Sequence, residues 1–480
     1  MLFRTRFTKI FFALLLAVSL IVISIAIESE AAQNIDMKIG VADGVTSGKV
    51  MGEGLVFTDA KGRSGNVRSG AVIKASGAGI SVGNTVLTMP VTAIAKSGMG
   101  WEGVRYRGKL VFIRAASGFT VVNEIDLENY LRGVLSVEMP MDWPPEALKA
   151  QAILARTYAI KNRGGYSKRG YDLAAGESSQ MYRGINAEDP RADRAVSQTA
   201  GMVLTWNGQT ADVFYHSDSG GATADLAHVW GGSRPYLQVR SEAVNYTSPN
   251  STWQVVLSPS QITSILSRMK HNVGNVQSIA VALVDNAGRA VQLTFTGDRG
   301  AVNVKAHDFR MAAGPRVIKS TNLQITRSGG TRPVRSRQPN VPQAQQIPSA
   351  AEKQPVSPPE INQLRGDIIE MTRLGIFTSK ELLDMLSNPE KREEYVAIGL
   401  ERLRERVEVP ASITPEPTRA PNPIPPTVPQ QTGSGDFVFT GRGWGHGVGL
   451  SQWGAKTMAE QGMKYEEILA HYFPGTKIGK

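Results

Sequence analysis

Hydrophobic and polar positions change their period several times along the chain, and each change predicts a different kind of structure. Residues 33–125 hold short apolar runs between glycine-rich turns, which predicts a small, mostly antiparallel β region. Residues 126–162 have helical periodicity, and 200–325 return to strands interrupted by a few helices. Residues 437–480 begin with a strand and end in a helix. Strands, then helices, then strands predict an α+β fold.

Two proline-rich stretches divide the later part of the chain. Residues 326–360 and 410–436 predict extended linkers without a core of their own. Helical spacing between them predicts a helical hairpin over 361–409. We therefore expect this segment to be an insert that loops out from the surface, while 126–325 and 437–480 together form one core.

The amino terminus has the pattern of an export signal. Arg4, Arg6 and Lys9 precede an apolar run over residues 10–27, and small residues follow it. Residues 1–31 are therefore predicted to be a cleaved signal peptide or an uncleaved membrane anchor. Both alternatives place the rest of the chain outside the cytoplasm, as a secreted or membrane-anchored protein.

Composition narrows the classes of function. The 480 residues are 41% hydrophobic and 20% charged, which is typical of a folded protein. The net charge of +11 is spread along the chain without a basic stripe interleaved with aromatics, so we expect anionic surroundings but no nucleic acid. The absence of cysteine excludes disulfides, cysteine-bound metals and thiol nucleophiles.

One acidic residue falls on an apolar helix face in residues 126–140. Apolar positions recur at i, i+3, i+4, i+7 and i+8 from Leu127, and Glu138 follows at i+11. Because Pro140 ends the helix, Glu138 lies in its last turn. Burial and the negative end of the helix dipole both raise the pKa of such a carboxyl, which suits a general acid. The alternative is a buried structural acid neutralised by an arginine.

The next segment, 143–162, predicts an alanine-rich helix that packs on nearly all sides. Its polar residues Gln151, Arg156 and Thr157 are therefore not all expected to face water. Three roles stay open for Arg156: it orients Glu138, it binds substrate oxygen atoms, or it balances a buried charge.

Other acidic residues have weaker patterns. Glu128 lies four residues before Arg132, so we expect these two to form a surface ion pair. Asp218 and Glu177 are the candidates for a second carboxylate near Glu138.

Two glycine-rich segments carry further polar residues. In Tyr215–Gly221, YHSDSGG, three adjacent residues cannot form a relay in line, so a Ser-His-Asp triad is rejected. The paired glycines instead predict a turn that presents Ser219 and backbone N–H groups to a ligand. Gly441–Trp453, GRGWGHGVGLSQW, contains His446 but lacks the ending of a phosphate-binding loop. It is either a floor for sugar stacking or a turn packed on the core.

The histidines do not predict a metal site. The six in the chain show no i, i+4 pair and have no cysteine partner. We therefore expect neither a metal nor another cofactor.

The motifs together resemble the SpoIID/LytB family. LENYLRGVLSVEMP and EALKAQAILARTYAI are similar to its opening signature, and SSQMYRG, YHSDSGG, VWGGSRPYL and GRGWGHGVGLSQWGAKTMAEQG follow in the same order. The resemblance runs from about residue 104 to 478, without the insert. It implies a mixed fold with short antiparallel strands and the alanine-rich helix around a glycan cleft.

The resemblance also implies an activity. SpoIID-type members are lytic transglycosylases that cleave peptidoglycan glycan strands stripped of stem peptides, in cell-wall remodelling or sporulation. Glu138 then corresponds to the catalytic acid. The expected substrate-binding residues are Arg156, Gln180, Tyr182, Tyr215, Ser219 and His446.

The family leaves a second function open. LytB-type members are described as enhancers of a cell-wall amidase, so this chain is alternatively a non-catalytic glycan-binding partner of an amidase or of another division or sporulation wall protein. A third alternative is a wall-binding structural protein. Some sporulation members hold a metal on cysteines and a histidine, and this chain has no cysteine for such a site.

Overall fold

A computed structural model describes residues 35–77, 79–242, 248–328 and 435–480, which all belong to one compact unit of the chain. The predicted leader at 1–31 and nearly all of the predicted insert lie outside the described residues. Within the described residues, no helix is long and apolar enough to cross a membrane.

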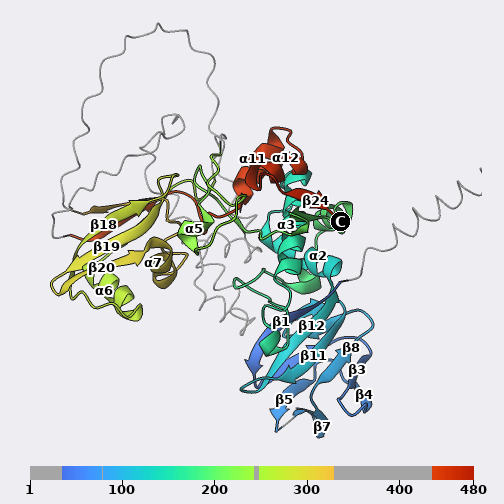
Figure 1. Ribbon diagram of the computed structural model, residues 1–480. Coiled ribbons are helices and arrows are strands. Elements are labelled where there is room, and N and C mark those ends of the chain that lie inside the picture. Colours follow the sequence, from blue (N-terminus) through green and yellow to red (C-terminus); the bar gives the residue numbers. More distant parts are fainter. Residues whose placement is uncertain (1–34, 78, 243–247, 329–434) are drawn as a thin grey trace, which may run out of the picture. The chain divides into compact units, whose positions relative to one another are not determined.

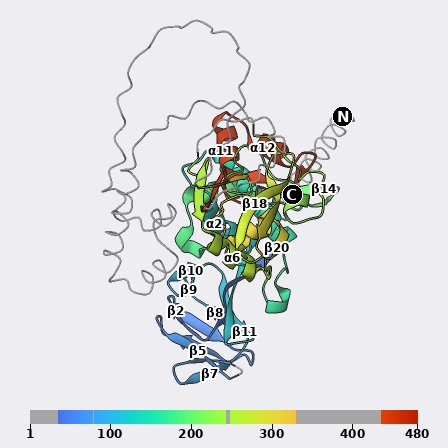
Figure 2. The same cartoon turned by 90° about the vertical axis from the view of Figure 1, so that its left-hand side faces the viewer.

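The predicted β region is confirmed as two facing sheets (Figures 1 and 2). One sheet has the order β13-β1-β12-β11-β8-β3-β4 and the other β10-β9-β2-β5-β6-β7, and every pairing except β1 with β13 is antiparallel. Inward side chains of both sheets share one apolar core with the helices that follow. The strands are β1 Asp36–Val45, β2 Ser47–Met51, β3 Leu55–Thr58, β4 Ser64–Val67, β5 Val72–Ser76, β6 Gly79–Val82, β7 Thr85–Thr88, β8 Val91–Ile94, β9 Met99–Trp101, β10 Val104–Tyr106, β11 Lys109–Arg114 and β12 Phe119–Asp126.

Two helices follow directly, as the periodicity predicts. Helix α2 is Leu127–Glu138, and its amino end is capped by the Asp126 carboxylate, which accepts from the Asn129 N–H at 3.0 Å. Helix α3 is Pro145–Lys161, and it lies between two apolar cores because alanines let its neighbours approach closely. Short elements then continue the chain: η1 Ser167–Arg169, β13 Leu173–Ala174, η2 Gly184–Ala187 and α4 Pro190–Gln198.

The region after α4 returns to strands, as predicted. A separate apolar core forms between β17–β21 and helices α6 and α7, and strands β18, β19 and β20 make an antiparallel sheet over it. The elements are β14 Val203–Trp206, β15 Gln209–Thr210, β16 Tyr215–His216, α5 Leu226–Val229, β17 Trp253–Leu257, α6 Pro259–Arg268, β18 Val276–Val284, β19 Ala290–Gly297, β20 Gly300–Lys305, α7 Ala306–Ala313 and β21 Leu323–Arg327.

The carboxy-terminal block pairs with three sheets. Strand β22 lies between β17 and β21, and β23 runs parallel to β16. The last strand, β24, pairs with β14 and was not expected from the sequence. The elements are β22 Phe437–Gly441, β23 Leu450–Ser451, α11 Gln452–Glu460, α12 Tyr465–Tyr472 and β24 Lys477–Gly479. The α+β class with mostly antiparallel sheets is therefore confirmed.

The two ends of the insert meet in the structure, which predicts that it can be removed. Arg327 pairs with Phe437 at the end of the β21–β22 ladder, and the Ser328 N–H donates to the Asp436 carbonyl at 2.8 Å. Closing this junction with a short turn removes the insert without breaking a described strand. We expect a chain with residues 330–434 replaced by Asn-Gly to retain a single cooperative thermal unfolding transition. Loss of cooperativity would contradict this, and removal of β22 serves as the unfolded control.

Candidate active site

Glu138 is the last residue of α2, as its spacing predicts, and its half-buried carboxyl has few partners. Its Oε1 accepts from the Met181 backbone N–H at 2.9 Å, and the Tyr215 hydroxyl is a second hydrogen-bond partner. Burial raises the pKa of Glu138 from 4.5 to about 7, although both hydrogen bonds act in the opposite direction. The carboxyl is therefore divided between its neutral and ionised forms near pH 7.

A buried amide holds Tyr215 against this carboxyl. Gln180 is almost fully buried, and its Nε2 donates to the Tyr215 hydroxyl and to the Ala155 carbonyl, each at 3.2 Å. Its Oε1 accepts from the Tyr130 hydroxyl at 3.2 Å. The predicted residues Gln180 and Tyr215 are thus brought together with Glu138. Gln180, however, lies behind the site and does not reach its surface.

Two further tyrosines act on this site and were missed by the sequence analysis. The charge of Glu138 raises the pKa of both Tyr130 and Tyr158, after the larger effect of burial. Tyr158 is hydrogen-bonded to Ser179, next to Gln180 in the chain. Tyr158 lies three residues after Ala155, whose carbonyl accepts from Gln180, and therefore on the same face of α3. This spacing was the signal available in the sequence.

Neither candidate for a second carboxylate joins Glu138. Asp218 is buried, with its carboxylate accepting from the Gly220 N–H at 2.7 Å and from the Ser248 hydroxyl. Glu177 has 75% of its side chain exposed and pairs with Arg316 at 3.4 Å. Among the described residues, no other carboxyl shifts the pKa of Glu138. The site therefore rests on a single acid.

The structure corrects the role of Arg156. Its side chain is fully buried and binds Glu128 through two hydrogen bonds of 2.7 Å, while its remaining N–H groups reach Thr199, Met202 and Val196. No donor is left for Glu138 or for a substrate. The predicted Glu128–Arg132 pair is also wrong, because Glu128 turns inward to Arg156. The third alternative, a balanced buried charge, is the one observed.

Tyr182 and Ser219, two of the predicted substrate-binding residues, are core residues in the structure. The Tyr182 ring packs on Tyr130 at a centroid distance of 4.9 Å, and its hydroxyl donates to Asn123 at 2.8 Å. The Ser219 hydroxyl donates to the Glu242 carboxylate at 2.6 Å, and the Ser219 side chain is fully buried. The YHSDSGG turn does not present Ser219 to the surface: the Ser219 side chain is buried, and its backbone N–H donates to the Ser451 hydroxyl at 3.3 Å.

His446 supports Tyr215 from the carboxy-terminal block. Its Nδ1 accepts from the Val448 N–H at 3.1 Å, and its Nε2 lies 3.0 Å from the Tyr215 carbonyl. Burial, with the charge of Arg310, lowers the pKa of His446 to about 3, so the ring is neutral and its Nε2–H donates to Tyr215. Both ring nitrogens are therefore occupied, and His446 positions Tyr215.

The alternating glycines around His446 allow this contact. Gly445 and Gly449 have φ of +126° and +73°, and a Cβ at these positions would meet the His216 Cβ at 2.6 Å and the Phe214 carbonyl at 2.2 Å. The sequence left two interpretations of GRGWGHGVG, a floor for sugar stacking and a turn packed on the core. Gly445 and Gly449 fit the second, because both lie against neighbouring backbone or core atoms. Trp444 lies beneath the Lys319 ammonium, 5.4 Å from its ring centroid.

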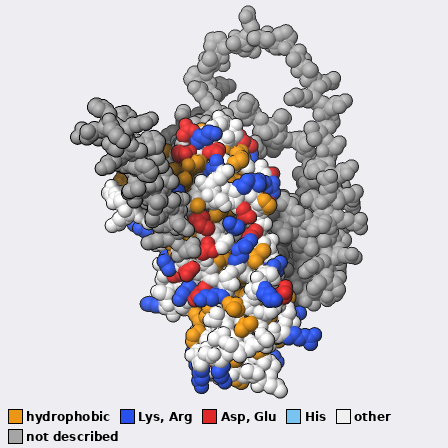
Figure 3. Space-filling view, turned by 90° about the vertical axis from the view of Figure 1, so that its right-hand side faces the viewer, with side chains coloured by type: hydrophobic (Ala, Val, Ile, Leu, Met, Phe, Trp, Pro, Cys, Tyr) orange, Lys and Arg blue, Asp and Glu red, His pale blue; other side chains and the backbone are white. Residues whose placement is uncertain are grey.

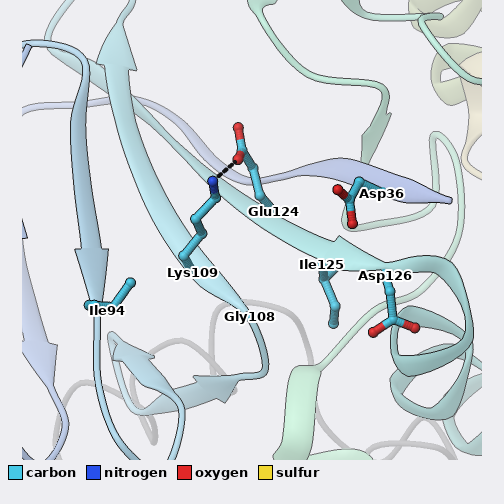
Figure 4. Close-up of a pocket in the computed structure, with 7 residues that line it drawn as sticks. All are labelled: Asp36, Ile94, Gly108, Lys109, Glu124, Ile125 and Asp126. Carbon is cyan, nitrogen blue, oxygen red and sulfur yellow. Dashed lines mark ion pairs between the residues drawn. The ribbon is translucent and has the colours of Figure 1, made fainter. Parts of the chain in front are cut away.

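A shallow, open surface pocket lies elsewhere. It has a volume of about 410 Å³ and includes Asp36, Lys109, Glu124 and Asp126 (Figure 4). Lys109 pairs with Glu124 at 2.8 Å. Asp126 caps the amino end of α2, so the 12-residue helix, roughly 18 Å long, separates this pocket from Glu138. On the face in Figure 3, basic and acidic side chains are interspersed and form no basic stripe.

Comparison with known proteins places one segment of the chain in a family. Residues 115–206 match the SpoIID family, stage II sporulation protein, and this range includes Glu138 and Gln180. This segment is a SpoIID segment. The match covers α2 and α3, and Tyr215 and His446 lie beyond it.

Three relatives are similar to this chain beyond the SpoIID segment. It is 30% identical over 235 residues to an uncharacterized protein of Brachyspira hyodysenteriae, covering 48% of the chain and 61% of that protein. It is 27% identical over 348 residues to the amidase enhancer of Bacillus subtilis, covering 72% of the chain and 40% of that protein. It is 20% identical over 374 residues to stage II sporulation protein D of Bacillus amyloliquefaciens, covering 75% and 76%. The chain therefore spans less than two thirds of the first two relatives.

The raised pKa of Glu138 predicts a pH-dependent stability difference. The carboxyl titrates near 4.5 when unfolded and at about 7 when folded, so its ionisation destabilises the folded state as the pH rises through this window. We expect Glu138→Gln to gain stability over the native chain between pH 4.5 and 7.5, by on the order of 3 kcal/mol. Chemical denaturation at several pH values measures this, and a difference independent of pH would contradict the raised pKa.

The Glu128–Arg156 pair, in which Arg156 is buried and the Glu128 side chain is 34% exposed, predicts a structural effect. Replacing Arg156 by Met removes the partner of Glu128 and the donors to Thr199, Met202 and Val196, and should lower the free energy of unfolding by about 2 kcal/mol. Because exposed ion pairs contribute little, Arg316→Met, which breaks the Glu177 pair, should change it by about 0.5 kcal/mol. Chemical denaturation compares the two. Unchanged stability with weakened glycan binding would instead make Arg156 a substrate ligand.

Proposed function

We propose that this protein is an extracytoplasmic peptidoglycan lytic transglycosylase in which Glu138 acts first as acid and then as base. The observation that carries the proposal is the single half-buried carboxyl with a pKa of about 7, beside a neutral tyrosine. A pKa near the working pH lets one group release and regain a proton at similar cost. A hydrolase of the usual kind needs two carboxyl groups, and this site has one.

The reaction balances with Glu138 alone. Its carboxylic acid gives a proton to the glycosidic oxygen that leaves C1 of the muramoyl residue, and the C1–O bond breaks. The resulting carboxylate removes the proton from the C6 hydroxyl of the same sugar as that oxygen bonds to C1. The products are a 1,6-anhydromuramoyl end and a new free hydroxyl on the departing sugar. Glu138 is protonated again, and no water is consumed.

Tyr215 stabilises the ionised stage of this cycle. Burial, followed by the charge of Glu138, raises the pKa of Tyr215 well above 10, so its hydroxyl remains a donor throughout. Its hydrogen bond, together with the Met181 N–H, serves the carboxylate better than the acid. Gln180 and His446 hold Tyr215 in place through its hydroxyl and its carbonyl.

The proposed substrate and location rest on the resemblance to the SpoIID family. That resemblance implies glycan strands stripped of stem peptides as the substrate, and the bacterial cell wall as the setting. The predicted leader at residues 1–31 agrees with an extracytoplasmic location, through secretion or a membrane anchor. The proposal requires neither a metal nor another cofactor.

A second function is favoured by one relative. The amidase enhancer of Bacillus subtilis matches 72% of this chain. On this alternative the protein binds glycan without cleaving it and increases the activity of a cell-wall amidase. The surface contacted by the amidase, or by another division or sporulation wall protein, would then be the functional one.

The two proposed functions can be distinguished by the glycan products that the protein releases. The full chain is incubated with denuded glycan strands and, separately, with intact peptidoglycan, and products are identified by mass spectrometry. We expect anhydromuramoyl ends from denuded strands, and a loss of at least about a thousandfold in rate with Glu138→Gln. Glu177→Gln is the matched control, because this exposed acid lies outside the site, and it should retain turnover.

Other results point away from catalysis. Binding of denuded strands without cleavage, combined with stimulation of an added amidase, would support the enhancer function. Cleavage that persists in Glu138→Gln would remove Glu138 from the reaction.

A further inference from the structure

Trp230 is unusual in its exposure. Its side chain is 43% exposed, and no other Trp, Phe or Tyr of the described ranges is classed as exposed. It follows α5 directly, and Gly231 and Gly232 continue the chain with φ of +88° and +78°. A hypothetical Cβ on either glycine meets no atom within 4 Å, so the surface beside the indole is open.

The indole is held rigidly despite this exposure. Its Nε1–H donates to Nε2 of His307, on α7, at 3.2 Å. Its ring packs against Phe214 and His446, at centroid distances of 4.9 Å and 4.7 Å. Three segments far apart in sequence therefore fix one ring. Because its only polar group is already bonded, the exposed part of Trp230 is carbon surface.

This ring is connected to the candidate active site. Phe214 immediately precedes Tyr215, and His446 donates to the Tyr215 carbonyl. Two of the three residues that support Trp230 thus also adjoin or hold the backbone of the tyrosine that contacts Glu138. Tyr215 therefore joins Glu138, which it contacts through its hydroxyl, to the residues on which the indole packs.

The chemistry of the exposed surface fits a sugar ring. A pyranose presents a flat face of C–H groups, and an aromatic face fixed in advance binds it without the cost of ordering a side chain. Burial lowers the pKa of both His307 and His446, so these supporting rings are neutral near pH 7 and place no charge beneath the indole. A single fixed ring suits one sugar of a chain better than a broad protein contact, whose apolar core is larger.

We propose that Trp230, fixed by His307, Phe214 and His446, is a stacking platform for one sugar ring of a glycan strand, beyond the bond cleaved at Glu138. This inference rests on the proposed function for the identity of the polymer. It assigns to α7, in the part of the protein with its own apolar core, a share in substrate binding through His307. Longer strands should therefore bind more tightly than short ones.

The test measures binding separately from cleavage. Glu138→Gln in the full chain serves as a non-cleaving background, and denuded glycan strands of at least eight sugars are titrated by calorimetry. Adding Trp230→Ala should weaken binding about tenfold, while Trp230→Phe should retain most of it. Leu283→Ala, which removes another exposed apolar side chain, is the matched control and should bind normally. A disaccharide should not distinguish these variants.

A second readout identifies the ring in contact. The indole N–H signal of Trp230, assigned by its absence in Trp230→Phe, should shift and saturate as the long strands are added. Thermal unfolding of Trp230→Phe should match that of the background, so that lost binding is not lost folding. His307→Ala should weaken binding less than Trp230→Ala, because it frees the indole without removing it.

The outcomes keep the two proposals apart. Weaker binding in Trp230→Ala with a shifted indole signal supports the platform even if the native chain never cleaves glycan. Equal affinity of Trp230→Ala and the background, or an indole signal that ignores glycan, overturns the platform even if cleavage occurs. A signal that responds to an amidase and not to glycan would also overturn it, and would assign Trp230 to a protein interface.

Discussion

The burial of α3 between two apolar cores is the constraint on which the site depends. One core comes from the amino-terminal sheets and α2, and the other from the carboxy-terminal block and the strands near residue 213. Alanines allow this close packing, so the polar groups on the helix can be satisfied only inside the protein, and the amide of the fully buried Gln151 has no hydrogen-bond partner among the described residues. Arg156 binds Glu128, the Thr157 hydroxyl accepts from the Leu204 N–H at 2.9 Å, and the Ala155 carbonyl receives Gln180.

The same burial explains why Glu138 remains partly neutral. The carboxyl ends α2 where the two cores meet, and it is compensated by only two hydrogen bonds. Among the described residues, no arginine shifts the pKa of Glu138. Arg156 on the adjacent helix pairs with Glu128, which lies ten residues before Glu138 in α2. The pKa of the acid is therefore set by burial and two hydrogen bonds rather than by a charged neighbour.

Periodicity predicted the elements but not the partners. The stripe from Leu127 correctly places Glu138 in the last turn of α2, because helix geometry fixes which side chains share a face. It could not show that Glu128 turns toward Arg156, since that choice depends on segments more than twenty residues away. The burial of Tyr182 and Ser219 was not predicted for a related reason. A polar residue within a motif can either contact a ligand or complete a buried hydrogen-bond network, and the sequence does not distinguish the two. Strand β24 was not predicted because its three residues are too few to show a hydrophobic period.

The position of Tyr215 shows how the carboxy-terminal block enters the site without contributing an acid. His446 lies 231 residues later and reaches the Tyr215 carbonyl because Gly445 and Gly449 let two backbones approach without side chains between them. The segment that matches the family, residues 115–206, supplies Glu138 and Gln180 but neither Tyr215 nor its support. Since the Tyr215 hydroxyl is one of two donors to Glu138, the protonation of the acid depends on folding of both ends of the chain. The insert need not disturb this arrangement: residues 328 and 436 adjoin, so the intervening chain can vary without moving β22 or the glycine-rich segment after it.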